Sequence, residues 1–361
     1  MRKQLTLFLL VFLPVYLSAQ DLITVEPPSG ASSTYTDLQA ALDAAPSGSK
    51  VIVSGGTWSA SNGTGNFIID KRVHLLGAGF EVDSTKATRR TNILATIQLG
   101  ENSDGTIIEG IDLQGSITNY LPNIGNSSVS NITIKSIRVN NLSFSYDVNI
   151  PVPQPEVSNL FISNSLIGSI NLGFARGVKI TNSIFGYITT LNGQATIENN
   201  IFNHIYGCVA NTLFRNNIIT NEFNYYGSCG FGCSCFGHNG NYFYNNIFSF
   251  PKIGSIPESP SEVAQGNKYE VDMSSIFQVY APALAGDFHY YYKQFDFHIK
   301  PGSAADNAGT DGTDIGIYGS GRPWKEGAVP SNPHIQSKTI APETDAQGRL
   351  NVNIRVKAQG N

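Results

Sequence analysis

The sequence predicts an all-β solenoid, in which short strands stack as the chain winds forward. One observation is a composition with 36 glycines, only 14% charged residues and few strong helix formers, which is typical of β-rich proteins. The other is a hexapeptide that recurs seven times, as IEGIDL (108–113), IKSIRV (134–139), ISNSLI (162–167), ITNSIF (180–185), IENNIF (197–202), FRNNII (214–219) and FYNNIF (243–248). The shortest steps between copies, 17 or 18 residues, leave no room for a crossover helix, so they favour coils of parallel strands joined by tight bends.

The hexapeptide positions predict the direction of each side chain. Positions 1 and 6 are apolar in every copy and should face the core, whereas position 2 is mostly polar and should face outward. Stacked asparagines can hydrogen-bond to one another along the axis and satisfy the backbone groups of the bends. We expect such a ladder at position 3, which is occupied in the last five copies by Asn164, Asn182, Asn199, Asn216 and Asn245.

Position 5 predicts an aliphatic stripe on the outside of the coils. The first two copies place Asp112 and Arg138 there, and the next five place Leu166, Ile184, Ile201, Ile218 and Ile247. Soluble proteins rarely leave such a stripe exposed. Either a loop or the C-terminal segment covers it, or it is the docking surface of a protein partner, or the assignment of inward and outward positions is wrong.

Residues 1–20 have the pattern of a secretory signal peptide. Arg2 and Lys3 precede an apolar stretch at 5–17, and LSAQ supplies small residues for cleavage. Thirteen apolar residues are too few to span a bilayer comfortably, so we expect no membrane span in the mature chain. The expected location is extracellular or at the cell surface, with the periplasm as an alternative. Without this leader the chain has 21 Lys and Arg against 27 Asp and Glu, which argues against a nucleic-acid partner.

Three parts of the chain resemble the pectin-lyase-like family of secreted right-handed parallel β-helices. LQAALDAA, KVIVSGGTW and VHLLGAGF resemble its N-terminal capping helix and first coils, and the NNIF bends resemble its asparagine ladder. DFHIKPGSAADNAG (296–309) with DIGIYG (314–319) resembles its closing segment. The resemblance covers roughly residues 22–325 and implies the fold alone, because the family includes lyases, hydrolases, epimerases, adhesins and non-catalytic proteins.

The predicted organisation follows from these patterns. We expect a signal peptide at 1–20, one right-handed parallel β-helix domain at 21–329 and a C-terminal β-hairpin or tail at 330–361. The capping helix should lie within 34–48, with Thr36 as its N-cap and Pro46–Gly48 at its end. Two alternating runs, 334–340 and 349–356, flank PETDAQG and predict the hairpin.

The sequence offers few candidates for catalysis. Lyases of the resembled family use an Arg or Lys base, and its hydrolases use clusters of Asp. The chain contains no Asp-Asp, Gly-His-Gly or Arg-Ile-Lys, so the hydrolase signature is absent. Lys179 and Arg215 are weak candidates for a lyase base. The alternative is that position-2 residues form ion pairs across neighbouring strands, Glu109 with Lys135 and Glu198 with Arg215.

Two further segments contain groups that could bind metal or form disulfides. Asp306, Asp311 and Asp314 lie near glycine turns and could bind Ca²⁺, although such residues often cap their own turns. Cys208, Cys229, Cys233 and Cys235 should form two disulfides in an exported chain, with a metal site and free thiols as alternatives. Three pairings are open, and a Cys233–Cys235 bridge is disfavoured by its geometry.

Aromatic side chains in two inserts, 140–159 and 221–244, predict the binding site. Such rings can stack on sugar rings, or they can pack among themselves and hold the loops. The candidates are Phe144, Tyr146, Tyr225, Tyr226, Phe231, Phe236 and Tyr242. We expect a non-catalytic protein that binds a polysaccharide or surface glycan through these loops. The alternatives are a polysaccharide lyase, or another carbohydrate-active enzyme, and a structural or adhesive surface protein.

Overall fold

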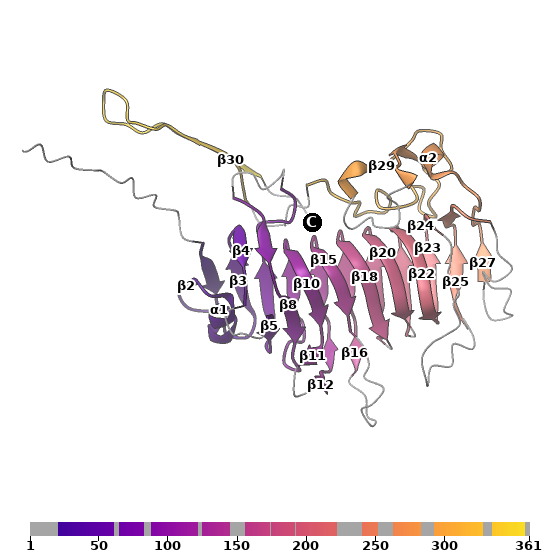
Figure 1. Ribbon diagram of the computed structural model, residues 1–361, viewed down its shortest axis with the longest axis horizontal. Coiled ribbons are helices and arrows are strands. Elements are labelled where there is room, and N and C mark those ends of the chain that lie inside the picture. Colours follow the sequence, from indigo (N-terminus) through magenta and orange to yellow (C-terminus); the bar gives the residue numbers. More distant parts are fainter. Residues whose placement is uncertain are drawn as a thin grey trace, which may run out of the picture.

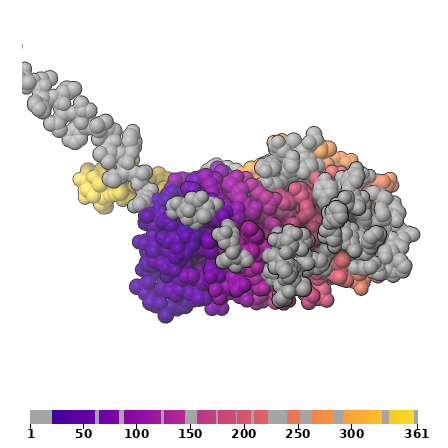
Figure 2. Space-filling view, turned by 60° about the horizontal axis from the view of Figure 1, so that its bottom comes forward, coloured from indigo at the N-terminus to yellow at the C-terminus, as the bar shows by residue number. Residues whose placement is uncertain are grey.

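The computed structural model describes residues 21–60, 65–82, 88–121, 125–144, 156–173, 175–191, 193–221, 240–251, 263–282, 292–327 and 334–357. The predicted signal peptide lies outside these residues. The described chain is all-β, with two long sheets of mostly parallel strands and two short helices. The two sheets extend along an elongated body, whose coils follow one another from the N-terminal end onward (Figures 1 and 2).

Sheet A has twelve strands in the described part of the chain. In spatial order they are β2 (Ser33–Tyr35), β1 (Ile23–Glu26), β3 (Ser49–Val53), β6 (Val73–Leu76), β9 (Ile107–Glu109), β14 (Thr133–Lys135), β17 (Phe161–Ser163), β19 (Val178–Thr181), β21 (Ala195–Glu198), β23 (Thr212–Arg215), β25 (Tyr242–Tyr244) and β27 (Val263–Gln265). β1 pairs antiparallel with β2 and β3, and every later pairing in the sheet is parallel.

Sheet B has eleven described strands, all paired in parallel. Its main path is β26 (Ile247–Phe248), β24 (Ile218–Ile219), β22 (Ile201–Val209), β20 (Ile184–Leu191), β18 (Leu166–Gly173), β15 (Arg138–Ser143), β10 (Asp112–Thr118), β7 (Thr91–Ile93) and β4 (Gly56–Trp58), and β8 (Thr96–Leu99) joins β10 to β5 (Asn66–Ile69). From β9 to β26 the chain alternates between the two sheets, which is consistent with a β-helix-like solenoid. Short strand pairs beside the sheets are β11 (Tyr120–Leu121) with β12 (Gly125–Asn126) and β13 (Val129–Ser130) with β16 (Val157–Ser158).

The hexapeptide is the link between the sheets in each coil. Positions 1 and 2 end a strand of sheet A, positions 3 and 4 form the bend, and positions 5 and 6 begin a strand of sheet B. The seven copies stack in the register that the alignment predicts, in both sheets. Positions 1 and 6 are buried in one apolar core between the sheets, as predicted.

The asparagine ladder is one position later than predicted. The five asparagines at position 3 have φ between 47° and 56°, the left-handed conformation that Asn tolerates at a tight bend. The continuous ladder runs through position 4, where Asn200 Nδ2 donates to Asn217 Oδ1 at 3.1 Å and Asn217 Nδ2 donates to Asn246 Oδ1 at 2.9 Å. Asn246 continues it to Asn267 Oδ1 at 3.1 Å. Position 3 contributes a single such bond among the described residues, from Asn245 Nδ2 to Asn216 Oδ1 at 3.0 Å.

A short helix closes the N-terminal end of the core, as predicted. α1 (Leu38–Ala44) buries Leu38, Ala41 and Leu42 against the first coils. Its N-cap is Asp37 rather than Thr36, because the Asp37 carboxylate accepts a hydrogen bond from the Ala40 backbone N at 2.8 Å. No described helix is long and apolar enough to cross a membrane.

The aliphatic stripe of position 5 is buried beneath the C-terminal part of the chain. A covering segment, residues 271–282 and 292–327, lies beyond one end of the strands (Figure 1). It contains α2 (Met273–Ile276), the 3-10 turn η2 (Tyr292–Gln294), and the antiparallel pair β28 (Phe277–Val279) and β29 (Asp296–Ile299). Its apolar side chains form a second core with the stripe, whose five residues are at most 1% exposed. The stripe is therefore covered by the chain itself, and the predicted docking surface for a protein partner is wrong.

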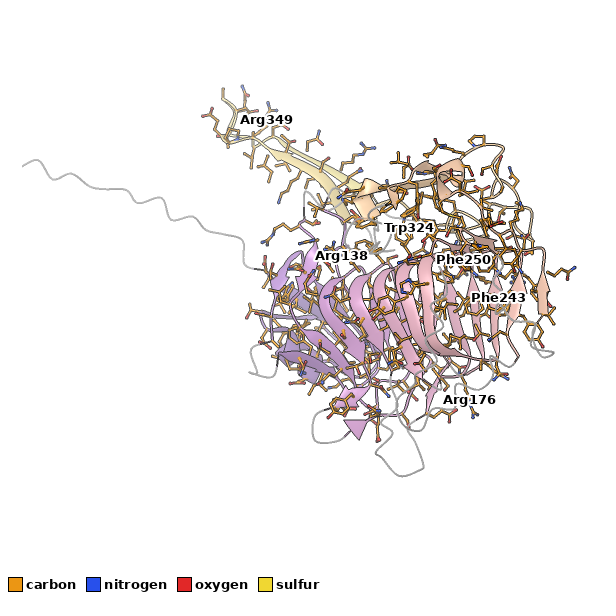
Figure 3. The ribbon with its side chains drawn as sticks, turned by 45° about the vertical axis from the view of Figure 1, so that its right-hand side comes forward. Arg138, Arg176, Phe243, Phe250, Trp324 and Arg349 are labelled. Carbon is orange, nitrogen blue, oxygen red and sulfur yellow. The ribbon has the colours of Figure 1, made fainter. Side chains whose placement is uncertain are left out.

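The chain ends in an antiparallel hairpin, as the alternating runs predict. β30 (His334–Ile340) pairs with β31 (Val352–Lys357), and neither strand joins another described sheet. Every β31 side chain is exposed, and Ile354 and Val356 are 51% and 58% exposed. Figure 3 places Arg349 at the far end of the hairpin, away from the two sheets. The hairpin therefore does not cover the stripe.

Candidate functional site

The outer face of sheet A collects the charged and aromatic side chains that the sequence singles out. Position 2 faces outward there, and so does the residue two places before it in the same strand. In this register Lys179, Leu213 and Tyr242 fall in one column, and Glu198, Arg215 and Tyr244 fall in the next. The structure thus brings together three predicted site residues, Lys179, Arg215 and Tyr242, on neighbouring coils.

Both candidate bases are bound to one carboxylate. Lys179 Nζ lies 2.5 Å from Glu198 Oε1, and Arg215 Nη2 lies 2.5 Å from Glu198 Oε2. Burial opposes the charge of Glu198, but hydrogen bonds from Lys179 and Arg215 hold its pKa below the ordinary value. Both candidate bases are therefore already engaged in ion pairs, an arrangement that does not favour either of them as a base. The predicted cross-strand ion pairs are confirmed here and at Lys135 and Glu109, 3.1 Å apart.

Two tyrosines extend this charged cluster toward the end of the sheet. Tyr242 and Tyr244 have ring centroids 6.2 Å apart and nearly parallel planes, and Tyr242 is 43% exposed. Tyr244 pairs with Arg215 in the strand register. Their faces present apolar surface beside the Arg215 guanidinium, which suits a ligand that has both C–H faces and carboxylates.

A cavity of ≈ 480 Å³ opens at this point. Its wall on the sheet side contains Arg215, Tyr244, Asn245 and Gln265, and the opposite wall is the turn 308–310 of the covering segment. The cavity therefore combines an aromatic ring, a guanidinium and two side-chain amides. These groups supply the hydrogen-bond donors and acceptors that a hydroxylated or acidic ligand requires.

The position-3 asparagines hold the opposite wall in place. Asn245 Nδ2 donates to the Ala308 carbonyl at 2.6 Å, and Asn216 Nδ2 donates to Thr310 Oγ1 at 3.0 Å. The Thr310 backbone N returns a bond to Asn216 Oδ1 at 3.1 Å. These contacts join residues more than sixty positions apart, so local sequence pattern gave no sign that the turn borders the site.

Of the predicted sugar-stacking residues, the structure describes only Phe144 and Tyr242. Phe144 is 2% exposed and packs in the core between the sheets, so its ring cannot contact a ligand and that prediction is wrong. Five other aromatic candidates, Tyr146, Tyr225, Tyr226, Phe231 and Phe236, lie outside the described residues, as do Cys229, Cys233 and Cys235 and the side chain of Cys208. The disulfides therefore stay a prediction.

The three aspartates proposed for Ca²⁺ each accept hydrogen bonds from their own turns. Asp306 accepts from the Gly302 backbone N at 2.6 Å, and Asp314 accepts from the Asn307 backbone N at 2.8 Å. Hydrogen bonds from Thr313 hold the pKa of Asp311 below its ordinary value. In the described ranges no group of three or more His, Cys, Asp or Glu side chains could hold a metal ion. Calcium binding at these turns stays a prediction.

Comparison with known proteins gives no relative from which a function could be carried over. No family model, no curated protein and no solved structure matches the chain.

Proposed function

We propose that this chain is a secreted right-handed parallel β-helix protein that binds an acidic polysaccharide or surface glycan along the outer face of sheet A, without catalysing its cleavage. The observation that carries the proposal is the juxtaposition of Arg215 and Tyr244 at the mouth of a ≈ 480 Å³ cavity. The alternation of the chain between two parallel sheets supports the fold, and its handedness is the one that nearly all parallel crossovers adopt.

The chemistry of the face fits an extended, negatively charged glycan. Lys179 and Arg215 are 48% and 41% exposed at their side chains, so both can approach a ligand while they contact Glu198. Arginine has five N–H donors in a planar fork, which exceeds what one carboxylate oxygen accepts. Tyr242 and Tyr244 add flat apolar surface for the C–H face of a sugar ring.

The same geometry favours binding over cleavage. A lyase base must be neutral to accept the proton next to the uronate carboxylate. Lys179 and Arg215 each form an ion pair with Glu198, an arrangement that suits contact with a charged ligand better than acceptance of a proton. The polysaccharide lyase is therefore the second candidate, and the structural or adhesive protein is the third.

Affinity measurements with a polyanionic and a neutral glycan test the proposal. Polygalacturonate should retard the purified mature protein in gel electrophoresis and bind in calorimetry, whereas dextran should not. Arg215→Gln and Tyr244→Ala should each weaken binding by about tenfold, because each removes a contact of roughly 1.4 kcal/mol. Lys135→Gln is the matched control, since Lys135 forms the same kind of ion pair on the same face, farther from the cavity.

Each outcome separates the candidate functions. Binding that is lost in Arg215→Gln and kept in Lys135→Gln supports the proposal. The appearance of unsaturated uronides, seen as rising ultraviolet absorbance, would instead show a lyase. No binding of either glycan would leave the structural or adhesive function and overturn the proposal.

A further inference from the structure

The C-terminal hairpin concentrates exposed aliphatic side chains. Of the twelve large hydrophobic side chains that are exposed among the described residues, five lie in this element, namely Ile340, Leu350, Val352, Ile354 and Val356. Each of the five is between 47% and 58% exposed. The hairpin projects from the body in Figures 1 and 3, and its strands pair only with each other in the described structure. Such a concentration of exposed apolar side chains marks an interaction surface.

The strand register places most of these side chains on one face. Val352, Ile354 and Val356 alternate along β31, so they point to the same side of the hairpin. Ile340 lies opposite Val352, and Lys338 lies opposite Ile354. Directly opposed residues share a face, so Ile340 and Lys338 belong to this side as well. The aliphatic face of the hairpin is defined here as Ile340, Val352, Ile354 and Val356.

The strands of the hairpin carry positive charge and no negative charge. Lys338, Arg355 and Lys357 are exposed, and β30 and β31 contain no Asp or Glu. The other charged residues of the hairpin are in its turn, where Arg349 Nε lies 2.9 Å from Asp345 Oδ2. Outside the hairpin, the chain after residue 20 has 17 Lys and Arg against 25 Asp and Glu. An anionic surface therefore attracts the hairpin and repels the body.

A second copy of the chain does not suit the aliphatic face. A stable protein interface takes about 20 to 30 residues from each side, whereas this face has four exposed aliphatic side chains. Lys338 is in the middle of the face, so two hairpins that packed face to face would bring two ammonium groups together. Addition of a further strand at either edge is disfavoured as well, because charged side chains on edge strands oppose it.

We propose that the hairpin binds the surface of an anionic lipid bilayer. An element with one aliphatic face and a cationic opposite face lies in the bilayer interface, where its apolar side chains contact the acyl chains. The methylene groups of Lys338 can stay in the apolar region while its ammonium group reaches the headgroups. Arg355 and Lys357 alternate with the aliphatic residues and so lie on the opposite face, close enough for anionic headgroups to attract them.

Sedimentation with lipid vesicles tests the proposal on the purified mature protein. Vesicles made of equal parts of phosphatidylglycerol and phosphatidylcholine should bind the protein saturably as lipid is added. Vesicles of phosphatidylcholine alone should bind at least about tenfold more weakly, because each Lys or Arg strengthens binding to an anionic surface about fivefold. Added salt should release the protein from the mixed vesicles.

Two aspartate substitutions distinguish the faces of the hairpin. Ile354→Asp and Asn353→Asp change the net charge equally, but the first alters the aliphatic face and the second alters the opposite face. Ile354→Asp should weaken binding to the mixed vesicles at least about thirtyfold, and Asn353→Asp only about fivefold. Arg355→Gln should also weaken binding about fivefold. Arg322→Gln is its matched control, because Arg322 is an exposed arginine of the covering segment, and it should have no effect.

A fluorescent reporter keeps the test decisive if Ile354→Asp unfolds the hairpin. Tryptophan is favoured in strands, so Ile354→Trp and Asn353→Trp should both keep the hairpin folded. Trp58 and Trp324 are 6% and 8% exposed, so their emission gives a constant background. The mixed vesicles should shift the emission of Ile354→Trp to shorter wavelength and leave that of Asn353→Trp nearly unchanged.

Four results would each overturn the proposal. These are no binding to the mixed vesicles, equal binding to both kinds of vesicle, equal effects of the substitutions at positions 354 and 353, and a dimer in solution that Ile354→Asp dissociates. The last result would show that a second copy covers the aliphatic face. The inference does not rest on glycan binding. Arg215→Gln should bind the vesicles as tightly as the parent protein, so failure of one proposal leaves the other standing.

Discussion

At the scale of single residues, the two adjacent asparagines of each NNI bend have separate roles. The first adopts the left-handed conformation that turns the chain from sheet A to sheet B, and it contacts the covering segment. The second is buried and satisfies backbone groups of neighbouring coils; Asn217, for example, donates to the Ile197 carbonyl at 2.8 Å and accepts from the Asn200 backbone N at 3.0 Å. The polar bend can therefore lie inside the protein without unpaired backbone groups.

Replacing the central rung of this ladder should be costly. Asn217→Ala leaves the buried Asn200 backbone N and the Ile197 carbonyl without a partner, so we expect the free energy of unfolding to fall by about 3 kcal/mol. Urea denaturation measures this change. Asn353→Ala, at an exposed position of β31, is the control and should change the free energy by less than about 0.5 kcal/mol. Equal effects of the two substitutions would show that the ladder does not stabilise the bends.

The buried carboxylate of Glu198 should make stability depend on pH. Because its pKa in the folded protein is lowered from 4.5, the ion pairs stabilise the fold above that value and the contribution disappears as pH falls through the folded-state pKa. Since Lys179 and Arg215 are partly exposed, Glu198→Gln should cost only about 1 kcal/mol at neutral pH. Denaturant titrations at neutral and strongly acidic pH measure this difference. A cost that stays the same at both pH values would contradict the assignment.

At the scale of elements, the covering segment and the hairpin differ in their contribution to the fold. The covering segment completes a second core over the position-5 stripe, with Ile276 and Phe277 fully buried. The hairpin exposes both faces of β31, and its strands pair only with each other in the described structure. We therefore expect changes in the covering segment to destabilise the protein, and removal of the hairpin to leave its stability unchanged.

A substitution and a truncation compare these two elements. Phe277→Ala should lower the free energy of unfolding by about 4 kcal/mol, since it opens a cavity in the second core. A chain that ends after Gly327 should melt at the temperature of the parent protein. Thermal unfolding followed by circular dichroism measures both. A truncated chain that melts much earlier would show that the hairpin packs against the body.

Much of the fold follows from the repeat, and particular residues show where sequence reasoning stops. The hexapeptide predicts the strands, their register and the buried positions 1 and 6, because alternation along a strand fixes the direction of each side chain. It cannot tell which asparagine of the pair forms the ladder. The sequence did contain a sign of the ladder at position 4, where earlier coils have Ser165 and Ser183. Their hydroxyls donate to the backbone carbonyl two residues earlier, as the Asn200 amide does.

The sequence predicts one part of the candidate site and not the other, and the difference has a physical reason. Lys179, Arg215 and Tyr242 lie on the regular coils, so their place on the outer face follows from the register. The wall at 308–310 comes from a segment that returns across many coils, and no local periodicity encodes such a return. The burial of Phe144 was missed because Phe144 directly follows strand β15 and packs in the core, where sequence alone suggested an exposed insert.

At the scale of the whole molecule, stability and binding are assigned to different sheets. The covering segment packs where the strands of sheet B begin, and its apolar side chains bury the position-5 stripe there. The outer face of sheet A keeps charged and aromatic side chains on successive coils, about 4.8 Å apart. Such a row of evenly spaced groups suits a polymer with a repeating unit better than a single small molecule.

A crystal structure of the mature protein with a short oligogalacturonate tests this arrangement most directly. We predict density for the oligosaccharide along the outer face of sheet A, with a carboxylate near Arg215 and a sugar ring against Tyr244. Density confined to a surface away from sheet A would contradict the proposed binding face.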